Sequence, residues 1–110
     1  MTKPTVRLLM IEDTTVQARL VQKLLSAAKT VTFEYQWVMT LTDGLKQLAE
    51  NNYDIVLTDL QLPEGYGLES FRMVQEHALD LPIVLLTNID DEIVALKAIA
   101  AGAQDYLVKS

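Results

Sequence analysis

The sequence predicts one α/β domain built on an open parallel sheet, and three observations support that prediction. Short apolar runs alternate with segments of helical period along all 110 residues, a pattern typical of parallel strands joined by crossover helices. Several of the runs end in a charged or hydroxyl side chain. The length suits a single core, so we expect one domain over residues 1–110.

The first half of the chain supplies two strands and two helices. Residues 6–11 form an apolar run, and apolar side chains then recur at helical spacing over residues 16–25. Residues 33–37 alternate apolar and polar side chains, which predicts an edge strand with one less buried face. Leucines recur through residues 41–48 and indicate a short helix that ends near residues 50–52.

A central strand and a long loop open the second half. Residues 55–58 are short and apolar on both faces, as expected for a strand in the middle of a parallel sheet. Proline and glycines mark residues 59–67 as a loop, and apolar positions over 68–78 predict the third helix. Pro82 then precedes a fourth strand over residues 83–86.

The last two elements are a fourth helix and a fifth strand. Three acidic residues at 90–92 favour a helix start, because the helix dipole stabilises negative charge in the first turn. Gly102 should end this helix, which leaves residues 104–109 as the last strand. We expect the helix to bury a stripe of three apolar residues: Ile93, Leu96 and Ala100.

Composition limits the function classes. Half of the residues are hydrophobic, and 15 acids against 9 bases give a net charge of −6. This balance argues against direct binding of nucleic acid or of an anionic membrane. The chain has no cysteine and no run near the ~20 apolar residues of a membrane span. We therefore expect a cytoplasmic globular protein.

Five side chains follow the predicted strands and can form a site. Glu12 and Asp13 follow the first strand, Asp59 the third, Thr87 the fourth, and Lys109 lies at the end of the fifth. The carboxyl ends of parallel strands lie at one edge of the sheet, where open α/β folds bind their ligands. We expect all five side chains to meet there in one cleft.

These residue types favour phosphoryl chemistry. Carboxylates about 4 Å apart repel by roughly 4 kcal/mol at an effective dielectric near 20, and Mg²⁺ is the cation that best suits such an oxygen-rich cluster. A metal, the Lys109 ammonium and the Thr87 hydroxyl are what a transferring phosphoryl group requires around its oxygens. With no cysteine, and with His77 away from the edge, Asp59 is the favoured nucleophile.

The chain resembles the response-regulator receiver domains of bacterial two-component signalling. The resemblance spans nearly everything from Val6 to Lys109 and rests on the order and spacing of four features. These are the acidic pair after the first strand, the segment DLQLPEGYG at residues 59–67, Thr87, and the segment YLVK at residues 106–109. It implies a doubly wound, flavodoxin-like sheet with strand order 2-1-3-4-5.

The resemblance also implies roles for the site residues. Asp59 would accept a phosphoryl group from a histidine kinase or phosphotransfer protein. Asp13, Asp59 and the backbone carbonyl of Gln61 would bind Mg²⁺, and Glu12 would act through water. Lys109 would pair with Asp59 before phosphorylation and with the phosphoryl group afterwards.

Two further residues would act as the switch. By resemblance, Thr87 would swing toward the phosphoryl group and Tyr106 would rotate inward to follow it. The face made by the fourth helix and fifth strand would change and so regulate an output domain or downstream protein, or support a homodimer. The chain would then be a signalling protein and not an enzyme, apart from its own phosphorylation and slow hydrolysis.

The end of the chain departs from the family pattern. Ser110 follows Lys109 where the family usually has proline, and the family's fifth helix is missing from this chain. We expect a domain truncated after the fifth strand, or one cut from a longer protein. The alternative is a variant that covers the exposed apolar surface by self-association.

Two other functions stay open. A pseudo-receiver would keep the fold as a protein-binding module without phosphorylation, although the complete set of five site residues argues against it. A Mg²⁺-dependent phosphatase of the haloacid-dehalogenase type would form the same aspartyl-phosphate. It would need an aspartate two residues after the nucleophile, where this chain has Gln61, which cannot transfer the proton.

Overall fold

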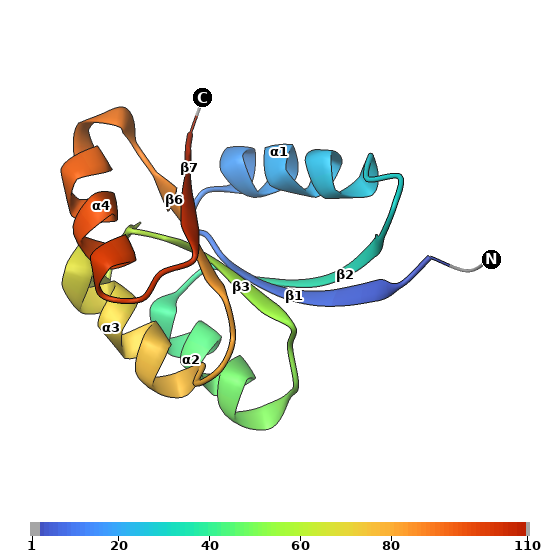
Figure 1. Cartoon of the computed structure of the whole chain (residues 1–110), viewed down its shortest axis with the longest axis horizontal. Helices are drawn as coiled ribbons and strands as arrows, with labels where there is room; N and C mark the ends of the chain where they lie inside the picture. The colour runs from blue at the N-terminus through green and yellow to red at the C-terminus, as the bar shows by residue number, and fades with distance from the viewer. Residues whose placement is uncertain (1–2, 110) are drawn as a thin grey trace.

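A five-stranded parallel sheet forms the centre of the molecule in the computed structural model, which describes residues 3–109 (Figure 1). The strands run in the order β2-β1-β3-β6-β7, so the expected doubly wound order is confirmed. Ser110 lies outside the described residues. The strand bounds are β1 (Thr5–Ile11), β2 (Thr32–Val38), β3 (Ile55–Asp59), β6 (Ile83–Thr87) and β7 (Asp105–Val108).

Within residues 3–109, four α-helices cover the two faces of this sheet. They are α1 (Thr15–Ser26), α2 (Leu41–Glu50), α3 (Leu68–His77) and α4 (Glu92–Ala100). Helix α1 covers one face alone, whereas α2, α3 and α4 lie together on the other (Figure 1). Among residues 3–109, every helix is too short or too polar to reach across a lipid bilayer.

Alternating side chains of β1 divide the core into two parts. Leu9 and Ile11 pack under the three helices, and Leu8 and Met10 pack under α1. Helix α2 approaches the sheet closely at Gly44, where an added Cβ would lie 2.8 Å from Cγ1 of Ile11. The glycine therefore lets α2 pack directly on the strand that leads to the acidic pair.

The prediction that α4 buries Ile93, Leu96 and Ala100 is wrong. Ile93 and Leu96 are 70% and 55% exposed, and Ala100 is exposed as well. The residues that α4 buries are Ala95 and Ala98, both fully inaccessible. Small side chains let this helix pack closely against α3 and the sheet. Because apolar residues occur on every side of α4, their spacing did not identify the buried face.

The loop after β3 contains a short hairpin that was not predicted. Its strands, β4 (Gln61–Leu62) and β5 (Gly65–Tyr66), pair antiparallel. The N–H of Gly67 donates to the carbonyl of Leu60 at 2.6 Å and closes the base of the loop. Gly67 has a φ of 70°, a conformation that favours glycine. Two-residue strands have no periodicity to detect, so only the loop was predictable.

Between β6 and α4, residues Ile89–Asp91 form a single turn of 3-10 helix, η1. Its first turn contains Asp90 and Asp91, and Glu92 then begins α4. The acidic residues 90–92 therefore lie at a helix start, as the sequence pattern predicted.

Candidate functional site

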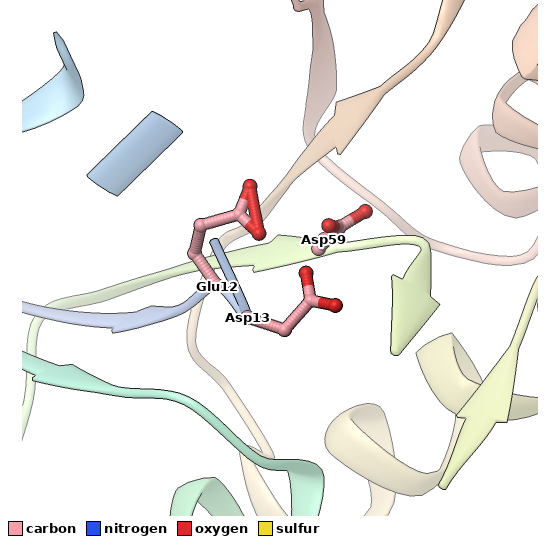
Figure 2. Close-up of side chains that lie close together, drawn as sticks. All are labelled: Glu12, Asp13 and Asp59. Atoms are coloured by element: carbon pink, nitrogen blue, oxygen red, sulfur yellow. The ribbon is translucent and has the colours of Figure 1, made fainter. Parts of the chain in front are cut away.

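Three carboxylates meet at the carboxyl edge of the sheet (Figure 2). Glu12 and Asp13 directly follow β1, and Asp59 is the last residue of the neighbouring strand β3. One carboxylate oxygen from each residue lies within 4.8 Å of the other two. Glu12 and Asp59 are buried and Asp13 is half-buried, so the strand register places an acidic cluster at the rim of the core.

Strand β2 fixes the backbone of Glu12. The Glu12 N–H donates to the carbonyl of Val38 at 3.0 Å, and the indole N–H of Trp37 donates to the Glu12 carbonyl at 2.8 Å. Trp37 lies near the end of β2. Its ring packs with the core under α1, while its polar end holds the residue that begins the acidic pair.

Lys109 directly follows β7, which lies at the other edge of the sheet from β2, and reaches the cluster from that side. Its backbone N–H donates to the carbonyl of Thr87 at 2.7 Å, which extends the pairing of β7 with β6. Its ammonium lies 2.5 Å from Oδ2 of Asp59 and 2.9 Å from Oε1 of Glu12. One cation thus bridges two of the three acids, although they lie 50 and 97 positions away in the chain.

The protonation equilibria reflect this crowding. Burial raises the pKa of the Glu12 carboxyl to about 7, and the neighbouring Asp59 adds to the increase. Burial alone would lower the pKa of Lys109, but hydrogen bonds to Asp59 and Glu12 outweigh it and raise that pKa. Without a further cation, Glu12 is therefore partly protonated near neutral pH, whereas Lys109 stays charged.

A polar cleft of about 470 Å³ opens beside Asp59. Asp13, Gln61 and Lys109 line it together with Asp59, so a small ligand there would reach all of these groups. Oδ1 of Asp59 accepts a hydrogen bond from the N–H of Gln61 at 2.9 Å. The side-chain amide of Gln61 donates to the carboxylate of Asp91 in η1 at 2.5 Å. No sequence pattern indicated this contact, which joins residues 30 positions apart.

The two predicted switch residues lie on the neighbouring strands β6 and β7 but in different surroundings. Thr87 ends β6, is buried, and donates its hydroxyl to the carbonyl of Asn88 at 3.0 Å. Tyr106 is half-buried in β7 and donates its hydroxyl to Glu92 of α4 at 3.0 Å. Thr87 therefore belongs to the edge beside the acids, and Tyr106 to the boundary between α4 and β7.

The donor set fits a hard divalent cation. The clustered donors are carboxylate oxygens, which Mg²⁺ prefers, and their spacing allows one ion to contact more than one of them. A cation also offsets the mutual repulsion that helps to raise the pKa of Glu12. Glu12, Asp13 and Asp59 can therefore hold a metal ion.

Comparison with known proteins agrees with this geometry. Residues 8–110 match the family model described as the response regulator receiver domain. The transcriptional regulatory proteins DltR of Streptococcus agalactiae and BasR of Escherichia coli are each 32% identical to this chain, over 94% of it and 45% of their own length. A protein-glutamate methylesterase/protein-glutamine glutaminase of a Nocardioides species is 32% identical over 96% of this chain and 29% of its own length.

Solved structures give the same result. A putative response regulator from Chloroflexus aurantiacus has a TM-score of 0.81 and 30% identity, over 97% of this chain and 86% of that one. Full-length FixJ from B. japonicum has a TM-score of 0.84 over 98% of this chain and 51% of that one; its 23% identity supports the fold alone. The chain spans less than half of the curated relatives compared above. It belongs to the family of response regulator receiver domains.

Proposed function

We propose that this receiver domain is a phosphoacceptor switch in which Asp59 takes a phosphoryl group from the phosphohistidine of a histidine kinase or phosphotransfer protein. The observation that carries the proposal is the setting of Asp59. Its carboxylate ends a buried strand, contacts the Lys109 ammonium at 2.5 Å, lies within the acidic cluster and opens onto a polar cleft.

In the transfer step, a carboxylate oxygen of Asp59 attacks phosphorus as the bond from phosphorus to the donor histidine nitrogen breaks. The nitrogen keeps the bonding electrons, and the product on this chain is an acyl phosphate. Lys109 pairs with Asp59 before the reaction and with the phosphoryl oxygens after it. That exchange keeps one positive charge next to the negative charge that moves into the site.

Asp13, Asp59 and the backbone carbonyl of Gln61 would hold Mg²⁺, and Glu12 would act through water. When bound, the ion supplies positive charge to the phosphoryl oxygens. The three carboxylates keep the cation site at the edge of the sheet, and the N–H of Gln61 orients the acceptor by donating to Oδ1 of Asp59.

The response to phosphorylation would pass through Thr87 and Tyr106. The Thr87 hydroxyl would leave the Asn88 carbonyl and donate to the phosphoryl group. Tyr106 would give up its 3.0 Å hydrogen bond to Glu92 and turn inward, which changes the face formed by α4 and β7. An output domain, a downstream protein or a second copy of the chain would read that face.

In this function the chain does not turn over a metabolite. The methylesterase activity in the name of the Nocardioides relative is not carried over, because the match covers only 29% of that protein. Phosphotransfer from a histidine kinase would place the domain in the cytoplasm. The single receiver domain would extend over residues 1–110, of which residues 8–110 match the family model, and act as one module of a signalling pathway.

The test is the intact mass of the protein after incubation with Mg²⁺ and acetyl phosphate or phosphoramidate. We expect wild type to gain one phosphoryl group and Asp59→Asn to gain none, with EDTA suppressing the gain in wild type. Equal labelling of Asp59→Asn would assign the acceptor elsewhere. A folded wild type that gains nothing from either donor or from a kinase would instead support the pseudo-receiver alternative.

A further inference from the structure

The first turn of α2 is capped by side chains from two separate parts of the chain. Thr40, the residue before the helix, accepts the N–H of Asp43 at 3.1 Å through its own hydroxyl. The remaining N–H groups donate to Glu64 from the turn between β4 and β5: that of Leu41 at 2.7 Å and that of Thr42 at 3.3 Å. The Thr42 hydroxyl donates to the same carboxylate.

This contact suits a charged carboxylate. The N-terminus of a helix carries partial positive charge and unpaired N–H groups, both of which favour an anion. The hydrogen bond from the Thr42 hydroxyl, together with those from the two backbone N–H groups, lowers the pKa of Glu64 below its usual value. Glu64 is exposed, yet it is ionised at neutral pH and meets three donors at once.

Glu64 belongs to the same short loop as the proposed acceptor. The loop begins at Asp59, is closed by the hydrogen bond from Gly67 to Leu60, and contains Gln61, whose backbone and side chain both make hydrogen bonds. The Gln61 side chain ties the loop to η1, and the Glu64 carboxylate ties it to α2. The hairpin is therefore held between two helical elements on the three-helix face of the sheet.

We propose that Glu64 is a positioning residue for the metal site, because its hydrogen bonds to α2 hold the hairpin whose Gln61 carbonyl would bind the ion. This inference rests on the function proposed above and adds a residue to it. Coupling between two sites is reciprocal, so an ion that orders the hairpin also steadies the Glu64 cap. The first turn of α2 then senses whether the site is filled.

The first experiment compares Mg²⁺ dissociation constants of wild type, Glu64→Ala and Thr40→Ala. Trp37, the one tryptophan of the chain, hydrogen-bonds to Glu12, so its fluorescence can follow the titration, with calorimetry as an independent measurement. We expect Glu64→Ala to weaken binding roughly 10-fold, as removal of groups that support metal ligands commonly does. Thr40→Ala removes the other cap of the same helix and should leave the constant within twofold of wild type.

Glu64→Gln supplies a rescue test. Its amide oxygen can replace only one of the two carboxylate oxygens, which accept the N–H groups of Leu41 and Thr42 separately, so we expect part of the lost Mg²⁺ affinity to return. Hydrogen exchange gives a second readout. Saturating Mg²⁺ should slow exchange of the Leu41 and Thr42 amides several-fold in wild type but not in Glu64→Ala, whereas a purely structural cap would show no dependence on Mg²⁺.

The outcomes separate this inference from the proposed function. Wild-type affinity in Glu64→Ala, or an equal loss in Thr40→Ala, would overturn the positioning role and leave the phosphoacceptor proposal intact. A wild type that binds no Mg²⁺ and accepts no phosphoryl group would overturn the function itself. If Glu64→Ala does not fold, hydrogen exchange of the Leu41 and Thr42 amides in wild type is the deciding test. Exchange rates that do not depend on Mg²⁺ would then overturn the inference.

Discussion

Ile11 and Glu12 are consecutive residues, both fully buried, and burial has opposite consequences for them. Ile11 packs in the core under α2, α3 and α4, where removing a side chain of this size from water contributes about 1.5–3 kcal/mol. Glu12 lies one position further, at the edge of the sheet, where burial raises its pKa to about 7 and so disfavours its charged form. Burial therefore stabilises the fold at Ile11 but opposes ionisation at the next residue, Glu12.

This difference shows that the core and the acidic edge have different roles: the core stabilises the fold, and the acidic edge forms the candidate site. The core under the three helices consists of apolar side chains that stabilise the fold. The acidic edge brings three carboxylates together, with one ammonium in contact with two of them, and burial there opposes the charged form of Glu12. Substitutions in the two regions should therefore shift stability in opposite directions.

The largest effect is expected in the core. Phe71 of α3 is fully buried, and Phe71→Ala should lower the free energy of unfolding by about 3–5 kcal/mol through lost burial and the cavity left behind. Urea denaturation measures the loss, and the Mg²⁺ affinity of the folded fraction should stay close to wild type. A loss below about 1 kcal/mol would contradict a core that carries the stability of the domain.

At the acidic edge we expect a gain instead. Glu12→Gln removes a carboxyl whose ionisation is opposed by burial, so the metal-free protein should be more stable at pH 8 by about 2 kcal/mol, while Mg²⁺ binds more weakly. Urea denaturation with EDTA tests this. Glu34→Gln, on the exposed side of β2, is the matched control and should change little. A less stable Glu12→Gln would show that the edge stabilises the fold.

The same residue predicts a pH dependence. Between an unfolded pKa near 4.5 and a folded pKa of about 7, the folded state binds more protons than the unfolded state, so stability falls as pH rises through this window. We expect a decline of about 1–2 kcal/mol in EDTA, measured by urea denaturation from pH 5 to pH 8. Mg²⁺ should reduce it, and Glu12→Gln should lack it. A stability that rises across this window in EDTA would count against the effect.

The smallest effect is expected on the outer side of α1. Leu24 is as apolar as the core leucines but 66% exposed, so Leu24→Ala should change the free energy of unfolding by less than about 0.5 kcal/mol. Thermal unfolding is sensitive enough to compare it with wild type. A loss similar to that of Phe71→Ala would show that something covers this side of α1 in solution.

The sheet and the meeting of the acids were predictable because both follow from where strands end. Apolar runs located the strands, and parallel pairing then brings the end of β1 beside the end of β3, with Glu12, Asp13 and Asp59 together. The buried face of α4 was not predictable. Ala95 and Ala98 pack there while Ile93 and Leu96 face outward, since close packing of the helix matters more than side-chain hydrophobicity.

The contacts that refine the site could not be predicted either. The indole of Trp37 bonds to the backbone of Glu12, Gln61 reaches Asp91, and Glu64 reaches the start of α2. Each joins residues more than 20 positions apart through hydrogen bonds that neither periodicity nor turn chemistry encodes. Such contacts depend on the tertiary arrangement of helices, strands and loops, which local sequence patterns do not specify.

The position of Lys109 in the chain has a consequence for synthesis. A ribosome delivers Glu12, Asp13 and Asp59 before it delivers Lys109, which lies 50 residues after Asp59. A nascent chain therefore holds the acids without the ammonium that bridges two of them. The last strand must emerge and dock against β6 before that charge arrives. The ion pair between Lys109 and Asp59 can therefore form only after β7 has been synthesised and has paired with β6.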